Sequence, residues 1–270
     1  MKDQKKDYKK NHKKDHKNDQ KDESFDDYKI EGRNPVLEAI QSGRTINKIM
    51  VADGQKEGSI KKILAKAKEQ GIVISYVDRQ KLNSLSESDN HQGVIAFIAA
   101  YDYKPLDELL EEIAAKEEEP FLIILDEISD PHNLGSIMRT ADAVGAHGII
   151  IPKRRAVGLT PVVAKTSAGA IEYVPVCRVT NIARTIDALK EKNIWVAGAD
   201  MAGEQTHFKS NMTGKFALVM GSEGQGISRL VKEKCDFLIN IPMIGKVSSL
   251  NASVAASVIM YEVFKQRQGL

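Results

Sequence analysis

Three polar clusters stand out because each directly follows a strand-like apolar run. The first is SDPHNLGSIMRT after FLIILDEI, with Asn133 and Arg139. The second is SEGQGIS after FALVMG, with Glu223 among spaced glycines. The third is MIGKVSSLN after DFLINIP, with Ser249 and Asn251. Open parallel sheets bind ligands beyond the carboxyl ends of their strands, so the three clusters together predict one ligand site.

The glycine-spaced loop allows the main chain to approach a ligand closely. Gly221, Gly224 and Gly226 lie between a predicted strand and a predicted helix, and glycine has no side chain to hold a ligand away. No GxGxxG or GxxxxGK[ST] pattern accompanies them, which argues against a dinucleotide or phosphate cradle. Glu223 would also repel phosphate. The loop favours a neutral or cationic ligand, or a carboxylate that holds an arginine or a main-chain loop.

Arg139 lies opposite the apolar stripe of its predicted helix, about 160° away at roughly 100° per residue. Such an arginine is ordinarily a solvated side chain. Asn133 is expected in the loop before the helix, where polar side chains cap helices or touch ligands. A structural and a catalytic role for Arg139 therefore both stay open. The stripe itself consists of Leu134, Ile137, Met138, Ala141 and Val144.

The third cluster opens a helix built almost entirely from Ala, Ser and Val. Ser249 and Asn251 have a simple interpretation as caps of that helix. No Ser-His-Asp constellation or HExxH helix accompanies them, so the sequence does not favour a hydrolase.

The elements that position these clusters alternate strand and helix over residues 121–270, which predicts a doubly wound parallel sheet. The strand-like runs are 121–128, 147–151, 173–179, 194–200, 216–221 and 236–242. The helical segments are near 134–144, 161–169, 181–192, 227–234 and 250–265.

Residues 28–102 predict a separate, smaller α/β unit. It has a helix in EGRNPVLEAIQSG, a strand at 46–53, a helix at 59–71, a buried strand in GIVISYVD and a strand at 93–101. A charged, helix-prone linker covers 103–120. Arg33, Asn34 and Lys48 lie at element ends, where they could contact the phosphates of a nucleic acid. Asn34 could equally cap a helix with Pro35 at its first position.

Composition indicates an ordinary cytoplasmic protein. No apolar run approaches the roughly 18 to 20 residues of a membrane span, and no signal peptide is evident. Two cysteines, Cys177 and Cys235, each within an apolar segment, do not form a disulfide framework.

The N-terminal segment 1–27 is predicted to be a disordered tail. Residues 1–24 hold nine Lys against five Asp and one Glu, a balance of +3. Subtracting this +3 from the chain's +2 leaves −1 for the remainder. A basic arm that binds RNA is an alternative to an inert tail. His12 and His16 are spaced by four residues, but no further ligand supports a metal site, and we expect none.

The three clusters resemble motifs of a known family. PHNLGSIMRTADAVGA, LVMGSEGQGIS and IPMIGKVSSLNASVAASV are similar, in order and spacing, to motifs 1, 2 and 3 of the SpoU, or TrmH, ribose 2′-O-methyltransferases of the SPOUT superfamily. The first unit, with GRNPVLEAI and HQGVIA, resembles the L30e-like RNA-binding domain of the bacterial 23S rRNA guanosine 2′-O-methyltransferases (RlmB type).

The resemblance implies a deep trefoil knot, whose small-residue helix passes through a loop, and a homodimer with active sites at its interface. It implies S-adenosyl-L-methionine as the cofactor, held by main-chain groups of Gly221, Ile241 and Leu250. Arg139 would be the main catalytic residue. Asn133, Glu223, Ser249 and Asn251 match the supporting positions of the site.

The substrate implied by the resemblance is RNA, and the first unit favours a guanosine of 23S rRNA. A tRNA, or the rRNA adenosine methylated by antibiotic-resistance relatives, is an alternative. A non-catalytic RNA-binding or ribosome-assembly factor is the rival class. Arg139, Glu223 and Asn251 argue against that rival, because binding alone does not need all three.

Overall fold

The computed structural model describes residues 28–55, 57–88, 90–247 and 249–270. The predicted tail at 1–27, including His12 and His16, lies outside the described residues. So does Ser248 in the third cluster.

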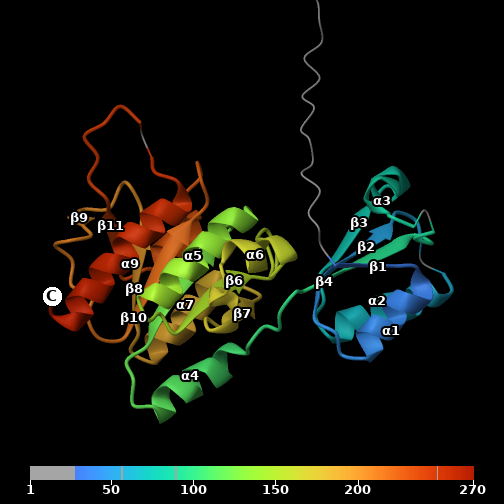
Figure 1. The fold of residues 1–270 in the computed structure, drawn as a ribbon, viewed down its shortest axis with the longest axis horizontal. Helices are drawn as coiled ribbons and strands as arrows, with labels where there is room; N and C mark the ends of the chain where they lie inside the picture. The colour runs from blue at the N-terminus through green and yellow to red at the C-terminus, as the bar shows by residue number, and fades with distance from the viewer. Residues whose placement is uncertain (1–27, 56, 89, 248) are drawn as a thin grey trace, which may run out of the picture.

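The first unit is built on a four-stranded sheet with the order β1-β4-β2-β3 (Figure 1). β4 pairs antiparallel with β1 and β2, and β3 pairs parallel with β2. The elements are β1 (Tyr28–Glu31), α1 (Arg33–Gln41), β2 (Ile46–Ala52), α2 (Ser59–Glu69), β3 (Ile74–Val77), α3 (Arg79–Leu85) and β4 (Val94–Ile98).

Three features of this unit differ from the sequence prediction. β1 and α3 were not anticipated, because each is short and lacks a long apolar period. β3 was predicted to be buried, but it is an edge strand with one neighbour, and Tyr76 is exposed. Asn34 does not cap α1: the cap is Gly32, and Asn34 is an exposed residue within the helix.

The second unit confirms the predicted parallel α/β architecture. Its seven strands have the order β7-β6-β5-β10-β8-β11-β9 and all pair in parallel. The strands are β5 (Phe121–Asp126), β6 (Gly148–Pro152), β7 (Val176–Val179), β8 (Trp195–Ala199), β9 (Gln205–Thr206), β10 (Phe216–Gly221) and β11 (Phe237–Asn240). The short β9 was not anticipated.

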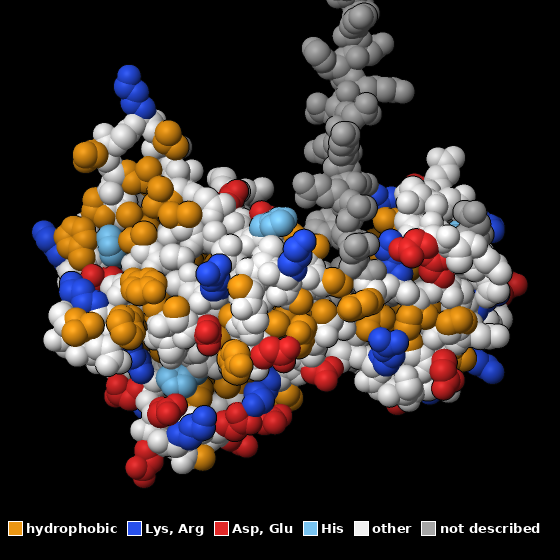
Figure 2. All heavy atoms as spheres, in the orientation of Figure 1, with side chains coloured by type: hydrophobic (Ala, Val, Ile, Leu, Met, Phe, Trp, Pro, Cys, Tyr) orange, Lys and Arg blue, Asp and Glu red, His pale blue; other side chains and the backbone are white. Residues whose placement is uncertain are grey.

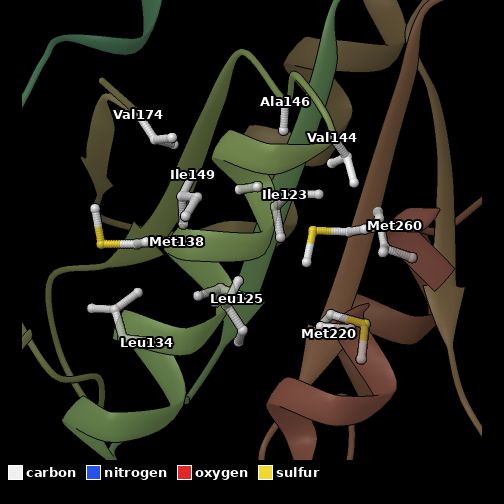
Figure 3. Close-up of a cluster of buried hydrophobic side chains, with 14 of the residues drawn as sticks. Ile123, Leu125, Leu134, Met138, Val144, Ala146, Ile149, Val174, Met220 and Met260 are labelled. Carbon is white, nitrogen blue, oxygen red and sulfur yellow. The ribbon is translucent and has the colours of Figure 1, made fainter. Parts of the chain in front are cut away.

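Helices cover both faces of this sheet because its central strands are apolar on both sides. Ile123 and Leu125 of β5 face one helical layer, while Leu122 and Ile124 face the other. Figure 3 shows the first layer, with Leu134 and Met138 of α5 lying over β5 and β6. That layer contains α5 (Pro131–Ala143), α6 (Pro161–Thr166), η1 (Ala170–Glu172) and α9 (Ala252–Gln268). The opposite layer contains α4 (Leu106–Ala115), α7 (Ile182–Glu191) and α8 (Arg229–Lys234).

The predicted linker 103–120 contains α4, and this helix packs into the larger core. Leu109 and Ile113 are buried beside Leu122 and Ile124 of β5. The chain that lies between the two packed units is therefore the short stretch from β4 to α4. The exact domain boundaries remain a prediction.

Arg178 of β7 ties the two units together. Its Nη2 donates to the carbonyl oxygen of Asn47 at 3.0 Å and of Lys153 at 3.2 Å, and its guanidinium lies 4.8 Å from the centre of the Tyr103 ring. The Tyr103 hydroxyl donates to Asn47 Oδ1 at 2.5 Å and accepts from the Leu159 N–H at 2.8 Å. These bonds fix the first strand-forming residues of β2 against the loop after β6.

We expect Tyr103→Phe to lower the free energy of unfolding by about 1 to 3 kcal/mol. The reason is that the buried Asn47 Oδ1 and Leu159 N–H both lose their hydrogen bond to the hydroxyl. Urea titration measures the loss. Tyr101→Phe is the matched control: the Tyr101 hydroxyl donates to the exposed Glu172 at 2.8 Å, so we expect a change within about 0.5 kcal/mol. Equal effects of the two substitutions would contradict the role given to Tyr103.

Candidate functional site

A pocket of about 420 Å³ lies where β10 and β11 end and α9 begins. It has an apolar floor and a rim formed by the glycine-spaced loop and by the residues before α9. Five residues predicted from the sequence line it: Gly221, Glu223, Ile241, Ser249 and Leu250. The structure therefore brings the second and third clusters together, as the sequence predicted for one ligand site.

The loop after β10 folds back tightly on itself. Ser222 and Gly226 form an antiparallel bridge, and a Cβ built on Gly221 would lie only 2.0 Å from the Gly226 carbonyl carbon. Gly224 and Gly226 have φ of 83° and 67°, a region that favours glycine. The loop consequently presents main-chain groups to the pocket, with little side-chain bulk.

Two carboxylates that sequence reasoning missed hold the surroundings of this loop. Asp126, buried at the end of β5, accepts from the Ser228 N–H at 2.8 Å. Asp200, which lines the pocket after β8, forms an ion pair with Lys232 at 2.5 Å. The signal for Asp126 was present, because an aspartate directly after a continuous apolar strand lies at the ligand-binding edge of the sheet.

Glu223 joins all three clusters. Its Oε1 accepts from Asn133 Nδ2 at 3.0 Å, from the Ala252 N–H at 3.2 Å and from Asn251 Nδ2. Asn251 Nδ2 also lies 2.9 Å from Asn133 Oδ1. One carboxylate thus connects the first turn of α5, the loop after β10 and the start of α9. Of the roles considered from the sequence, Glu223 therefore has that of a carboxylate that holds a main-chain segment. It also holds two amide side chains.

The position predicted for Asn133 was wrong. Asn133 was expected in the loop before the helix, but α5 begins earlier, at Pro131. Asp130 caps the helix by accepting from the His132 N–H at 2.8 Å, and proline is favoured at a first helical position. Asn133 is therefore buried in the first turn of α5, with its amide directed at Glu223.

Asn251 caps the N-terminus of α9, as one interpretation of the sequence predicted. Its Oδ1 accepts from the N–H groups of Ser253 at 3.0 Å and Val254 at 3.3 Å, while its Nδ2 bonds Glu223 and Asn133. The two ends of one amide thus serve the helix and the cluster at once. Ser249 is exposed and lines the pocket.

Arg139 lies apart from this cluster. Leu134, Ile137 and Met138 are fully buried, which confirms the predicted stripe, and Arg139 is exposed on the other side of α5. It does not line the pocket, and within the described part of the chain it has no hydrogen bond or ion pair with Asn133, Glu223 or Asn251. A single chain does not bring Arg139 into the pocket.

The three residues predicted to contact RNA do not share one surface. Arg33 lies at the start of α1, where its side chain donates to the Gln92 carbonyl oxygen at 3.1 Å and to Gln55 Oε1 at 2.6 Å. Lys48 lies near the start of β2, whereas Gln55, which Arg33 contacts, follows the end of that strand. The Lys48 Nζ is 4.6 Å from the centre of the Phe97 ring. Asn34 is exposed beside Arg33.

The described residues offer no metal site, membrane span or disulfide. No group of three His, Cys, Asp or Glu side chains there could hold a metal ion. No described helix is both long and apolar enough to cross a membrane. Cys177 and Cys235 are free thiols, and burial raises the pKa of each to about 12.

The fold and the pocket define an α/β protein that binds a ligand at the carboxyl edge of a parallel sheet. Family comparison specifies it further. Residues 120–261 match the SpoU rRNA Methylase family, and residues 29–104 match the family described as RNA 2′-O ribose methyltransferase substrate binding. The chain belongs to the SpoU rRNA methylase family.

Relatives and solved structures agree with this family. The chain is 56% identical to YacO of Bacillus subtilis, named as a TrmH family tRNA/rRNA methyltransferase, over 89% of this chain and 96% of that protein. It is 54% identical to a Staphylococcus haemolyticus protein of the same description, over 90% and 97%. The SpoU methyltransferase AviRb of Streptomyces viridochromogenes, solved with AdoMet, is similar with a TM-score of 0.57, 25% identity, and coverage of 90% and 92%.

We expect Glu223→Ala to lower the free energy of unfolding by about 1 to 3 kcal/mol, because the buried Asn133 amide loses its acceptor. Glu223→Gln is the matched control, since its amide oxygen still accepts hydrogen bonds, and it should cost less. Chemical denaturation of the two variants and the parent checks the order. An alanine variant as stable as the parent would show that the cluster does not hold the three segments together.

Proposed function

We propose that this protein transfers the methyl group of S-adenosyl-L-methionine to a ribose 2′-hydroxyl in RNA, and that its substrate is a guanosine of 23S rRNA. The observation that carries the proposal is the Glu223 cluster, which unites the three motifs of the family beside the pocket. The family match over residues 120–261 supports methyl transfer, and the match over 29–104 supports a ribose in RNA.

The pocket fits the proposed cofactor in size and character. Its volume of about 420 Å³ falls within the roughly 300 to 1,000 Å³ of small-molecule sites. Met220 and Ile259 give it apolar walls, and the turn from Gly221 to Gly226 lines it with main-chain groups. We propose that Gly221, Ile241 and Leu250 hold the cofactor. When bound, S-adenosyl-L-methionine supplies an electrophilic methyl group on a sulfonium.

The protein's own residues must align the ribose and remove its proton, because a ribose hydroxyl is a poor nucleophile. We assign these tasks to Arg139, which would hold the RNA phosphate or take part in proton removal, and to the supporting residues. Asn133 and Asn251 are oriented by Glu223, so their amides are fixed before RNA binds. Ser249 borders the pocket, where it can contact the incoming ribose.

Arg139 needs a second copy of the chain to reach a pocket, and we propose a homodimer. An apolar stripe on α9 supports this: Val254, Val258 and Tyr261 follow helical spacing and are 48%, 38% and 53% exposed. Figure 2 shows hydrophobic side chains gathered over this end of the molecule. α9 packs against α5, the helix that carries Arg139, so a partner docked on α9 would lie close to Arg139.

A trefoil knot is also part of the proposal. Its support is the way the end of the chain is enclosed: the Ala252 N–H bonds Glu223 in the loop after β10, and Gln266 Oε1 accepts from the Met212 N–H at 2.9 Å. Ala252 and Ala256 are buried, and their small side chains suit a helix surrounded by loops. A cytoplasmic location remains a prediction from composition.

The first unit is proposed to select the RNA. The family matched by residues 120–261 is described as acting on rRNA, which supports an rRNA substrate, whereas the relatives' names include both tRNA and rRNA. Mapping 2′-O-methyl groups in total RNA from cells with and without the gene tests the whole proposal. Loss of one mark in 23S rRNA supports it. Loss of a tRNA mark identifies the alternative substrate, and an unchanged map with no calorimetric binding of S-adenosyl-L-methionine supports the non-catalytic rival.

We expect Arg139→Ala to reduce single-turnover methyl transfer at least about a hundredfold, the range for losing a positioned acid–base group. The melting temperature should stay nearly unchanged, because Arg139 is exposed and opposite the core stripe. Cofactor affinity should also survive, since Arg139 does not line the pocket.

Arg184→Ala, which removes an exposed arginine from α7 on the opposite face of the sheet, is the matched control and should transfer at the parent rate. Analytical ultracentrifugation of both variants separates catalysis from assembly. A stable, dimeric and fully active Arg139→Ala protein would remove Arg139 from the mechanism. Loss of stability or dimerisation would instead assign it a structural role.

A further inference from the structure

A groove of about 480 Å³ lies between the two units, on the side where β6 ends. The first unit contributes residues of β2, β3 and β4, including Lys48. The second contributes the loop after β6, Ser129 from the loop between β5 and α5, and Arg178 of β7. None of Asn133, Glu223 or Asn251 lines it, so it is distinct from the pocket described above.

The groove is strongly basic. Its lining includes five cationic side chains and no carboxylate, although the chain after residue 24 has a net charge of −1. Arg155 has one acidic neighbour, Glu127, at 3.1 Å, but its side chain remains 80% exposed. Arg154 is exposed, and within the described residues it has no hydrogen bond or ion pair. The cations are Lys48, Lys153, Arg154, Arg155 and Arg178.

Arg178 is held in place before any ligand arrives. Arg178 is fixed by the carbonyl oxygens of both units, while its Nε is buried with no hydrogen-bond partner in the described structure. Arg155 has a φ of 58° and its ion-pair partner Glu127 has a φ of 62°, and a positive φ costs energy in residues other than glycine.

The groove opens on the same sheet edge as the catalytic cluster. β6 is the neighbour of β5, and β5 is the neighbour of β10, so the loops after these strands lie in a row. Ser129, at the groove, immediately precedes Asp130, which caps α5, and Asn133 follows within the first turn. A chain lying in the groove would continue toward the α5 end of the cluster.

We propose that this groove binds the sugar–phosphate backbone of the RNA substrate and leads it from the first unit to the ribose that is methylated. The inference rests on the proposed function and adds to it the place where RNA phosphates bind. Phosphate contacts from Lys and Arg position a nucleic acid without reading its sequence. The proposal gives the RNA contact predicted for Lys48 a place in this groove.

The test compares the full-length parent with Lys153→Ala/Arg154→Ala in binding a 23S rRNA transcript over a range of salt concentrations. Removing two phosphate contacts should lower the slope of log K against log salt by about 1 to 2, and weaken binding at least about tenfold near 0.1 M salt. The catalytic KM for RNA should rise, while S-adenosyl-L-methionine binding and the melting temperature stay the same.

Lys61→Ala/Lys62→Ala is the matched control, because it removes the same charge from the exposed face of α2. It should leave the salt slope nearly unchanged. Equal slopes for the groove variant and the parent would overturn the proposal, as would equal losses for the groove and control variants. Failure of the parent to methylate RNA from cells lacking the gene would instead overturn the proposed function. The two failures can be told apart, because the salt dependence of binding is measured without methyl transfer.

Discussion

The carboxylate of Glu223 is the contact on which the architecture of the site depends. It receives N–H donors from residues that lie 90 positions before it and 28 and 29 positions after it in the chain. Three segments that share no strand or helix therefore meet at one atom. Because the Asn133 amide is buried, breaking its bond to Glu223 would leave a buried donor without an acceptor, which costs free energy. Breaking an exposed ion pair would cost much less.

The same contact links folding to the site. α9 begins at Ala252, and its cap, Asn251, is held by Glu223 and Asn133. The last helix is therefore set in place by groups from the first and second motifs. Its buried face then completes the layer over β5 and β10. One local network thus borders the pocket and fixes the start of the helix that completes this core layer.

The sequence was sufficient for most of the parallel sheet and for the grouping of the site, because the strands are long apolar runs and the polar clusters follow them. It failed where a decision depends on tertiary contacts. Asn133 was placed in a loop because the capping strength of Asp130 and Pro131 was not weighed against the later apolar stripe. Edge exposure of β3 depends on strand order, which periodicity does not contain. The basic groove escaped notice because Lys48 lies more than a hundred positions before the run Lys153 to Arg155, and only the fold brings the two segments together.

The bond between the two units has a consequence for how such proteins diversify. Arg178 donates to main-chain carbonyl oxygens of β2 and of the loop after β6. Every amino-acid residue carries such an oxygen, whatever its side chain. Apart from Asn47, whose side chain accepts from Tyr103, side chains of the first unit can therefore be replaced during evolution with little effect on this attachment. Under the proposed function, a lineage could acquire a new choice of RNA by changing the outer faces of the small sheet, while the orientation of that sheet beside the larger one is inherited unchanged.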